Sequence, residues 1–221
     1  MHNLLIYGGT FDPVHNGHIQ TAVNVQKQFD FERFIFLPCK IPVLKNQALA
    51  TASQRVKMIE LALAPLSQHS FEINLSEINR NTPSYMVESL EYFRNKLGVN
   101  ISITLLMGRD TFNQLPSWYQ WTKLLKLTNL LVIKRPGYKE FTETEELREL
   151  IQNHETFVLD EIKKQRHGLI YSYDAGTYNF SSTWIREQIH EKNELKAYLS
   201  DSVIDYIRQN NLYSEVISGQ A

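Results

Sequence analysis

The stretch GGTFDPVHNGH, residues 8–18, decides the fold of this chain. Residues 4–7 before it form an apolar run typical of a short buried strand. After it, apolar residues recur at helical spacing from Ile19 to Phe29. We therefore predict a strand-to-helix turn at residues 8–18. Its first two glycines carry no Cβ and so let a ligand come close to the backbone.

Two histidines, His15 and His18, lie three residues apart at the predicted helix start. Unpaired N–H groups at a helix N-terminus favour an anion, so the turn suits a polyphosphate. The glycine spacing does not match the dinucleotide fingerprint, and the turn lacks the lysine of a P-loop. Two other roles for the histidines stay open: capping the helix only, or binding a metal as a pair.

The whole stretch resembles the signature G-G-T-F-D-P-x-H-x-G-H of the H-x-G-H nucleotidyltransferases. Within them it looks most like the bacterial nicotinate mononucleotide adenylyltransferases. The resemblance implies transfer of the adenylyl group of ATP to nicotinate mononucleotide, which gives deamido-NAD and pyrophosphate in NAD biosynthesis. It implies that His18 contacts the α-phosphate and that His15 binds the phosphates beside it. It also implies that backbone reaches the nucleotide at Gly8, Gly9, Thr10 and Phe11.

Composition limits the class of protein. The chain has 221 residues, enough for one α/β domain, and a formal net charge of -1, whereas a general nucleic-acid binder is usually basic. The single cysteine, Cys39, excludes an intrachain disulfide and fits a reducing cytoplasm. The start shows no signal-peptide pattern, and no apolar run approaches membrane length. We expect a cytoplasmic monomer or small homo-oligomer without nucleic-acid or membrane partners.

Apolar runs alternate with helical patterns along the chain. The runs predicted as strands are residues 4–7, 34–37, 71–73, 101–107, 130–133 and 169–171. Between them, Ser53 and Ser84 are the predicted N-caps of two helices, and residues 142–153 form a predicted acidic surface helix. This alternation predicts an α/β fold, a doubly wound Rossmann-like parallel sheet with helices on both faces. We predict one nucleotidyltransferase domain, residues 1–221, with a C-terminal helical segment from about residue 182.

Polar clusters follow the predicted strands, and in such sheets ligands bind beyond the carboxyl ends of the strands. After the second strand, Lys40 and Lys45 could hold phosphate, or could lie in a solvated loop. The resembling family commonly reads P-x-x-x-P-P-H-[KR] here. In this chain Val43 and Leu44 replace the second proline and the histidine. That departure leaves Lys45 as the expected phosphate contact.

The cluster after the third predicted strand, residues 77–85, resembles the family's E-x-x-R-x-x-x-S-Y segment. The resemblance implies that the pyridine carboxylate of the substrate is read near Ser84 and Tyr85. Threonine usually follows the tyrosine, but this chain has Met86. A structural ion pair between Glu77 and Arg80 is the alternative to direct substrate contact.

Two further elements follow later strands. A glycine and a carboxylate at a strand end suit ribose hydroxyls, and the resemblance supports this for Gly108 and Asp110. Trp118 matches the tryptophan that the family places against the nicotinate ring, although it could also be a packing residue. Arg135 belongs to a segment that resembles the family's R-x-G element after the fifth strand.

Residues 180–186, FSSTWIR, resemble the family's second signature I-S-[SA]-T-x-[IV]-R, with Phe180 at the isoleucine. Ser182 or Thr183 is the predicted helix cap, and Arg186 lies one turn further on the same side. With Ser181 and Ser182, the guanidinium would make a second anion site, unless this is only a capped helix. We expect Arg186 to hold the departing β,γ-phosphates.

Adenylyl transfer needs positioning and charge neutralisation rather than a general base, because the attacking phosphate is already ionised. Mg²⁺, held mainly by the ATP phosphates, is the expected cofactor, with no protein metal ligand predicted. The acceptor could instead be nicotinamide mononucleotide or phosphopantetheine. In a different class, the chain could be a non-catalytic nucleotide sensor on the same fold.

Overall fold

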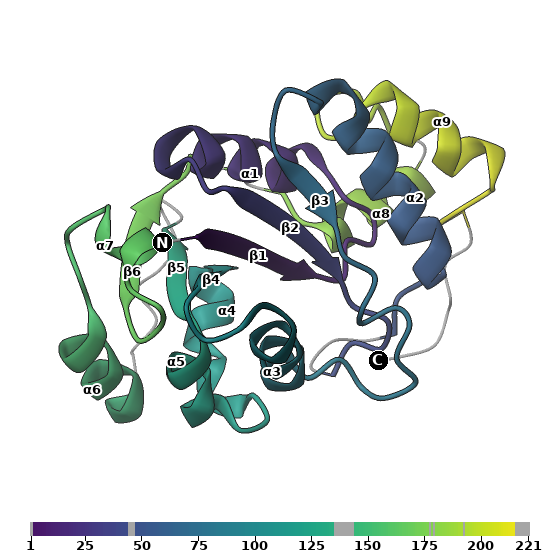
Figure 1. Ribbon diagram of the computed structural model, residues 1–221. Coiled ribbons are helices and arrows are strands. Elements are labelled where there is room, and N and C mark those ends of the chain that lie inside the picture. The colour runs from purple at the N-terminus through teal and green to yellow at the C-terminus, as the bar shows by residue number, and fades with distance from the viewer. Residues whose placement is uncertain are drawn as a thin grey trace.

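The computed structural model describes residues 2–43, 47–134, 144–176, 178, 180–191 and 193–214. These residues form a six-stranded sheet in the order β3-β2-β1-β4-β5-β6, and every neighbouring pair is parallel (Figure 1). The strands are β1 (Asn3–Gly9), β2 (Arg33–Pro38), β3 (Phe71–Ile73), β4 (Ser102–Gly108), β5 (Asn129–Lys134) and β6 (Ile170–Asp174). The predicted doubly wound parallel sheet is confirmed.

Helices cover both faces of this sheet, as Figure 1 shows for α1 and α2 against α3 and α5. One layer packs in a cluster with Phe34 and Phe36 and contains α1 (Asn16–Phe29), α2 (Ala52–Leu63), α7 (Glu161–Lys164), α8 (Ser182–His190) and α9 (Asp201–Gln209). The other packs with Ile35 and Leu37 and contains α3 (Met86–Leu97), α4 (Arg109–Asn113), α5 (Leu124–Leu127) and α6 (Glu145–His154). Strand side chains alternate between faces, so each buried strand serves both layers.

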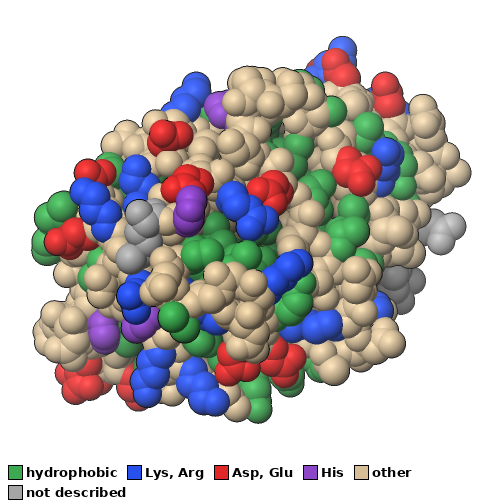
Figure 2. Space-filling model, in the orientation of Figure 1, with side chains coloured by type: hydrophobic (Ala, Val, Ile, Leu, Met, Phe, Trp, Pro, Cys, Tyr) green, Lys and Arg blue, Asp and Glu red, His purple; other side chains and the backbone are tan. Residues whose placement is uncertain are grey.

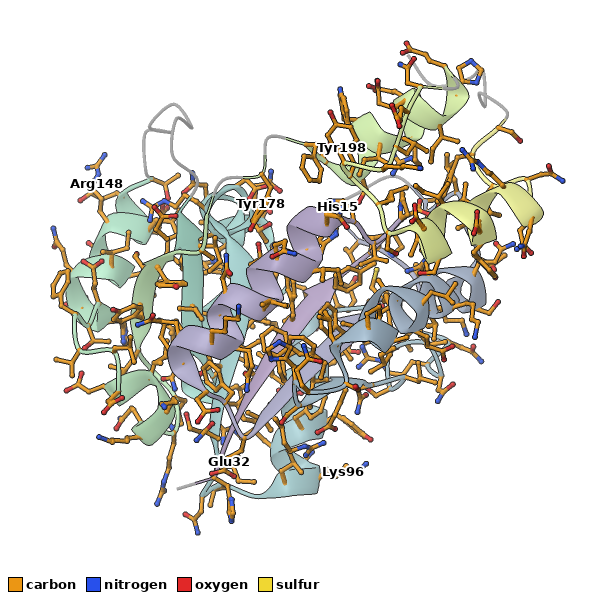
Figure 3. All side chains as sticks on the ribbon, turned by 90° about the horizontal axis from the view of Figure 1, so that it is seen from above. His15, Glu32, Lys96, Arg148, Tyr178 and Tyr198 are labelled. Carbon is orange, nitrogen blue, oxygen red and sulfur yellow. The ribbon has the colours of Figure 1, made fainter. Side chains whose placement is uncertain are left out.

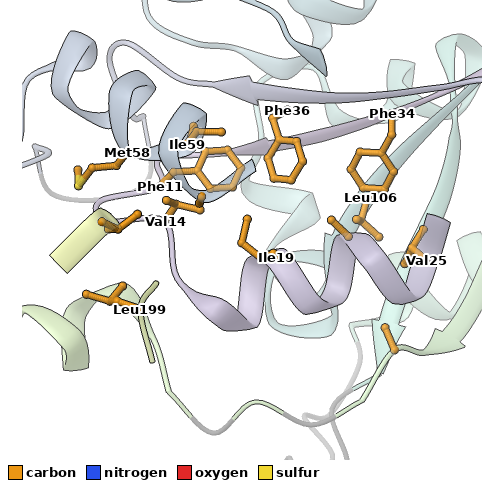
Figure 4. Close-up of a cluster of buried hydrophobic side chains, with 14 of the residues drawn as sticks. Phe11, Val14, Ile19, Val25, Phe34, Phe36, Met58, Ile59, Leu106 and Leu199 are labelled. Atoms are coloured by element: carbon orange, nitrogen blue, oxygen red, sulfur yellow. The ribbon is translucent and has the colours of Figure 1, made fainter. Parts of the chain in front are cut away.

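The signature loop between β1 and α1 is anchored by its own apolar residues. Phe11 is 2% exposed and packs against Phe36, with ring centroids 5.8 Å apart. Figure 4 shows Phe11 and Val14 in the same cluster as Ile19 and Phe36. Phe11 has φ 52, a left-handed conformation that a non-glycine residue adopts at a cost. Core packing therefore holds the loop in a conformation that its own backbone would not favour.

The predicted caps of α2 and α3 are wrong. Helix α2 is capped by Thr51, not Ser53, because Thr51 and Gln54 form a reciprocal capping box. Helix α3 begins at Met86 with Tyr85 at the N-cap, and Ser84 instead accepts a 3.2 Å hydrogen bond from the Lys40 backbone N–H. Helix α6 begins at Glu145, and residues 142–143 of the predicted helix lie outside the described residues.

The strand order reverses between β1 and β4. From β1 the sheet continues through β2 in one direction and through β4 in the other, and ligands bind at such a switch point. On the face seen in Figure 2, acidic and basic side chains are interspersed rather than gathered by sign. No helix among the described residues is long and apolar enough to cross a membrane.

Candidate active site

A cavity of about 660 Å³ lies at the carboxyl ends of β1 and β4. It brings together both signature segments, from opposite ends of the chain. In Figure 3, His15 stands at the N-terminal end of α1 near Tyr178, whereas Glu32 and Lys96 lie at the far end of the sheet. The predicted site residues that line the cavity are Gly8, Gly9, Thr10, Phe11, His15, His18, Gly108, Asp110, Trp118, Ser181, Ser182 and Arg186.

The two histidines both cap α1 and line the cavity. His15 is the N-cap residue, and its Nδ1 accepts from the His18 backbone N–H at 3.3 Å. The His18 Nδ1 accepts in return from the His15 backbone N–H at 3.3 Å, and the rings stack with centroids 3.7 Å apart. Because each Nδ1 is an acceptor, each neutral ring carries its proton on Nε2. Capping thus fixes the tautomer in which Nε2 can donate to a phosphate oxygen.

Arg186 reaches the signature loop from α8. Its guanidinium donates to the Asp12 carbonyl oxygen at 2.7 Å and to the Thr183 hydroxyl at 3.2 Å. The predicted cap of α8 at Ser182 or Thr183 is wrong, because Ser181 accepts from the Trp184 N–H at 3.2 Å.

Ser182 does not cap α8 but binds the signature loop. Its hydroxyl donates to the Pro13 carbonyl oxygen at 2.9 Å. The start of α8, the Arg186 guanidinium and the signature loop therefore meet at one edge of the cavity. This arrangement can bind an anion.

A smaller cavity of about 190 Å³ adjoins the first and shares with it Gly8, Gly9, Thr10 and Trp118. Its other walls include the predicted carboxylate-reading residues Ser84 and Tyr85. The N-cap residue of α3, Tyr85, makes no side-chain capping bond, so the first N–H groups of that helix can serve a ligand. The Tyr85 ring lies 4.6 Å from the Tyr119 ring, giving the cavity an aromatic side.

Glu77 lies at the wall of this smaller cavity and is 2% exposed. It accepts a 2.5 Å hydrogen bond from Ser89 and pairs with Arg80 at 3.7 Å. Burial raises the pKa of Glu77, and the hydrogen bonds from Ser89 and Ser84 and the Arg80 charge oppose that shift. The ion-pair alternative for Glu77 and Arg80 is therefore present in the structure, next to the cavity.

Of the predicted residues Lys40, Lys45 and Arg135, only Lys40 is described by the structure, and it is not among the walls of either cavity. Lys45 and Arg135 lie outside the described residues. Lys40 donates from Nζ to Asn81 Oδ1 at 2.8 Å.

Sequence reasoning missed one residue that shapes the site, Arg55 of α2. It is 1% exposed and donates to three backbone carbonyls, those of Thr10 at 2.6 Å, Ala50 at 3.3 Å and Lys40 at 3.4 Å. It thereby ties the signature loop to the loop after β2. The sequence contains a signal for this role, namely an arginine at a position on the buried face of an amphipathic helix. Such a buried cation needs hydrogen-bond partners inside the protein.

Gly108 provides a test of the Asp110 placement. A Cβ at Gly108 would overlap with Asp110 Oδ1, so Gly108→Ala must displace that carboxylate. If Asp110 binds ribose, the KM for ATP should rise about tenfold, the value of one hydrogen bond to a charged group. Steady-state kinetics would measure this, and Asp110→Ala should produce a similar rise. An unchanged KM in Gly108→Ala would remove Asp110 from the nucleotide site.

Comparison with known proteins agrees with this geometry. A cytidylyltransferase-like family model matches residues 6–188. The chain is 42% identical over 213 residues to a probable nicotinate-nucleotide adenylyltransferase of Legionella pneumophila (strain Paris), covering 96% of this chain and 100% of that protein. It is 34% identical to one of Yersinia pestis (strain Pestoides F), covering 94% of each.

Solved structures show the same fold. Nicotinic acid mononucleotide adenylyltransferase of Plasmodium falciparum complexed with NaAD superposes with a TM-score of 0.72 at 20% identity, covering 96% of this chain and 98% of that one. The same enzyme complexed with APC gives a TM-score of 0.69 at 18% identity, with the same coverage. From the family model and the curated relatives, the chain belongs to the cytidylyltransferase-like family and, within it, to the nicotinate-nucleotide adenylyltransferases.

Proposed function

We propose that the protein transfers the adenylyl group of ATP to nicotinate mononucleotide, forming deamido-NAD and pyrophosphate in NAD biosynthesis. The observation that carries this proposal is the pair of joined cavities. The larger is lined by His15, His18 and Arg186 and suits a triphosphate, and the smaller is aromatic and suits a pyridine ring. They meet at Gly8–Thr10, where the two substrates would join. The proposed compartment is the cytoplasm, because the lone Cys39 fits a reducing environment.

In the proposed reaction the phosphate of the acceptor attacks the α-phosphorus of ATP in line, and pyrophosphate leaves. The acceptor phosphate is already ionised, so the protein has to orient the reactants and stabilise growing negative charge. His18 would donate from Nε2 to the α-phosphate, with His15 beside it. Arg186 would hold the departing β,γ-phosphates, and Ser181 and Ser182 at the start of α8 support the same end of the triphosphate.

Selection of the nicotinate form is proposed to occur at the start of α3. Backbone N–H groups there can donate to both oxygens of a carboxylate, whereas an amide offers one oxygen and turns its NH₂ donors toward other donors. Met86 lines both cavities, and a Cβ at Gly8 would stand 2.7 Å from its terminal methyl group. Met86 therefore narrows the junction between the cavities without supplying a polar group that would favour the amide.

Mg²⁺ is the proposed cofactor. The described residues contain no group of three or more His, Cys, Asp or Glu side chains that could hold a metal ion. The Asp12 carboxylate accepts hydrogen bonds from Leu49, Ala50 and Tyr213. This carboxylate is engaged within the protein, and we propose that Mg²⁺ enters with ATP and keeps phosphate and water as its ligands. When bound, it would neutralise charge on the polyphosphate.

Trp118 tests the pyridine site. Trp118→Leu keeps apolar packing but removes the stacking surface, which is worth about 1–3 kcal/mol for a base on an aromatic ring. We expect the KM for nicotinate mononucleotide to rise about tenfold while the KM for ATP stays within about twofold. Trp121→Leu is the control, since Trp121 packs in the same apolar cluster but is not among the walls of either cavity. Equal effects of the two variants would remove Trp118 from the pyridine site.

The function itself is tested by measuring pyrophosphate release from ATP and Mg²⁺ with nicotinate mononucleotide, nicotinamide mononucleotide and phosphopantetheine offered separately. Release with the nicotinate form alone supports the proposal. Release with another acceptor would keep the adenylyl transfer and discard the substrate. ATP binding without release for any acceptor would favour a nucleotide sensor instead.

A further inference from the structure

The carboxylate of Asp12, inside the signature loop, connects distant segments of the chain. Asp12 is 4% exposed. Its Oδ2 accepts from the Leu49 backbone N–H at 2.8 Å, and its Oδ1 accepts from the Ala50 backbone N–H at 3.1 Å. Oδ1 also accepts from the hydroxyl of Tyr213 at 2.7 Å, across 201 residues of sequence. A buried carboxylate with three donors is strongly oriented.

Tyr213 follows α9 and is held where its hydroxyl can make this bond. The side chain is 8% exposed and belongs to the apolar cluster that also contains Phe11 and Val14 of the signature loop. Burial, followed by the neighbouring Asp12 charge, raises the pKa of Tyr213. The hydroxyl therefore stays protonated and acts as the donor to Asp12.

Arg186 lies within reach of the same carboxylate. Its Nη1 is 3.9 Å from Asp12 Oδ2 and 2.7 Å from the Asp12 carbonyl oxygen. At 3.9 Å the carboxylate attracts the guanidinium without a close hydrogen bond. Without the Tyr213 hydroxyl, Asp12 Oδ1 would keep only the Ala50 N–H as a donor in a buried site. Arg186, whose charge reaches this site together with that of Arg55, could then supply the missing donor. That shift would engage the guanidinium with Asp12 at the cavity wall and so draw it away from a phosphate bound in the cavity.

We propose that Tyr213 is a positioning residue for the triphosphate site: its hydroxyl satisfies the Asp12 carboxylate and so leaves Arg186 directed at the phosphates of ATP. The inference rests on the proposed function for the identity of the ligand. It assigns to the segment after α9 an effect on nucleotide binding that passes through Asp12 and Arg186, in addition to its packing against the core. The effect should concern ATP and not the acceptor, because Tyr213, Asp12 and Arg186 are not among the walls of the smaller cavity.

The test is Tyr213→Phe, which removes only the hydroxyl, with Tyr206→Phe on α9 as the matched control. We expect Tyr213→Phe to raise the KM for ATP about tenfold, while the KM for nicotinate mononucleotide stays within about twofold. Tyr206→Phe should leave both constants unchanged. If Tyr213→Phe lowers only the melting temperature and leaves the KM for ATP at the wild-type value, the role is structural and the proposal is overturned.

A double-mutant cycle shows whether the effect passes through Arg186. In an Arg186→Ala background, Tyr213→Phe should cause no further rise in the KM for ATP, because coupled residues are not additive. A further tenfold rise there would overturn the proposal. Calorimetric titration of each variant with ATP and Mg²⁺ gives the same comparison as a dissociation constant. If the wild-type protein binds ATP but releases no pyrophosphate, the proposed function is contradicted. The dissociation constants of the Tyr213 variants would still test the role of Tyr213 in ATP binding.

Discussion

Replacing His18 with alanine should lower turnover about 10²–10³-fold, the typical effect of deleting one donor to a transition-state charge. His18 lines the larger cavity, and its Nδ1 is occupied by the His15 backbone N–H, so its Nε2 carries the proton. A donor that acts mainly in the transition state changes kcat and kcat/KM together and leaves the KM for ATP within a few fold. Steady-state release of pyrophosphate measures all three quantities.

Loss of His18 also removes half of a capping box, so a change in helix stability has to be separated from a change in chemistry. Gln54 occupies the corresponding third position in the capping box of α2 and is not among the cavity walls. Gln54→Ala should therefore cost about as much melting temperature as His18→Ala while leaving turnover unchanged. Near-normal turnover in His18→Ala would contradict the assignment of His18 to the α-phosphate.

The fold was predictable because its signals are local. The strand runs and the helical spacing after the signature stretch follow from burial on one or both faces, and each is visible within a few residues. The strand order is not predicted from the sequence; the structure supplies it, and the polar residues that end β1 and β4 meet at its switch point. The sequence predicts that Gly8, His18 and Asp110 meet beyond the strand ends, and all three line the larger cavity.

Contacts between distant segments could not be predicted in this way. The bond from Tyr213 to Asp12 spans 201 residues, and no periodicity in either neighbourhood indicates it. The caps show the same limit on a smaller scale. Ser84 was predicted to cap α3, but its hydroxyl is taken by the Lys40 backbone N–H from a different loop. A polar side chain near a helix start can satisfy any nearby donor, and tertiary structure decides which one.

The acceptor is the part of the function that geometry alone constrains least. The larger cavity, with its histidines, arginine and helix N-termini, suits any triphosphate. Only the smaller cavity, with Trp118, Tyr85 and the first N–H groups of α3, bears on the second substrate. Family membership therefore adds information that the fold does not contain, since one fold serves many reactions.

Replacing Arg186 with alanine should lower kcat/KM for ATP about 10- to 100-fold, the value of hydrogen bonds from a charged donor to an anion. Arg186 lines the larger cavity, and its bond to the Asp12 carbonyl oxygen fixes the guanidinium beside the signature loop. Arg186→Lys should fall between the wild type and Arg186→Ala, because lysine keeps the charge but loses the planar fork of donors. Initial rates at varied ATP and saturating nicotinate mononucleotide measure both variants.

The control for this prediction is Arg208→Ala, an exposed arginine on α9 that is not among the cavity walls. It should leave kcat/KM for ATP unchanged, which excludes a general effect of removing one positive charge from the protein. If Arg186 only stabilised the fold through its ion pair with Asp12, Arg186→Ala would lower the melting temperature and leave kcat/KM for ATP unchanged. If Arg186→Ala matched the wild type in both KM and turnover, the α8 end of the cavity would have no part in binding the triphosphate. The phosphates would then depend on the α1 histidines alone.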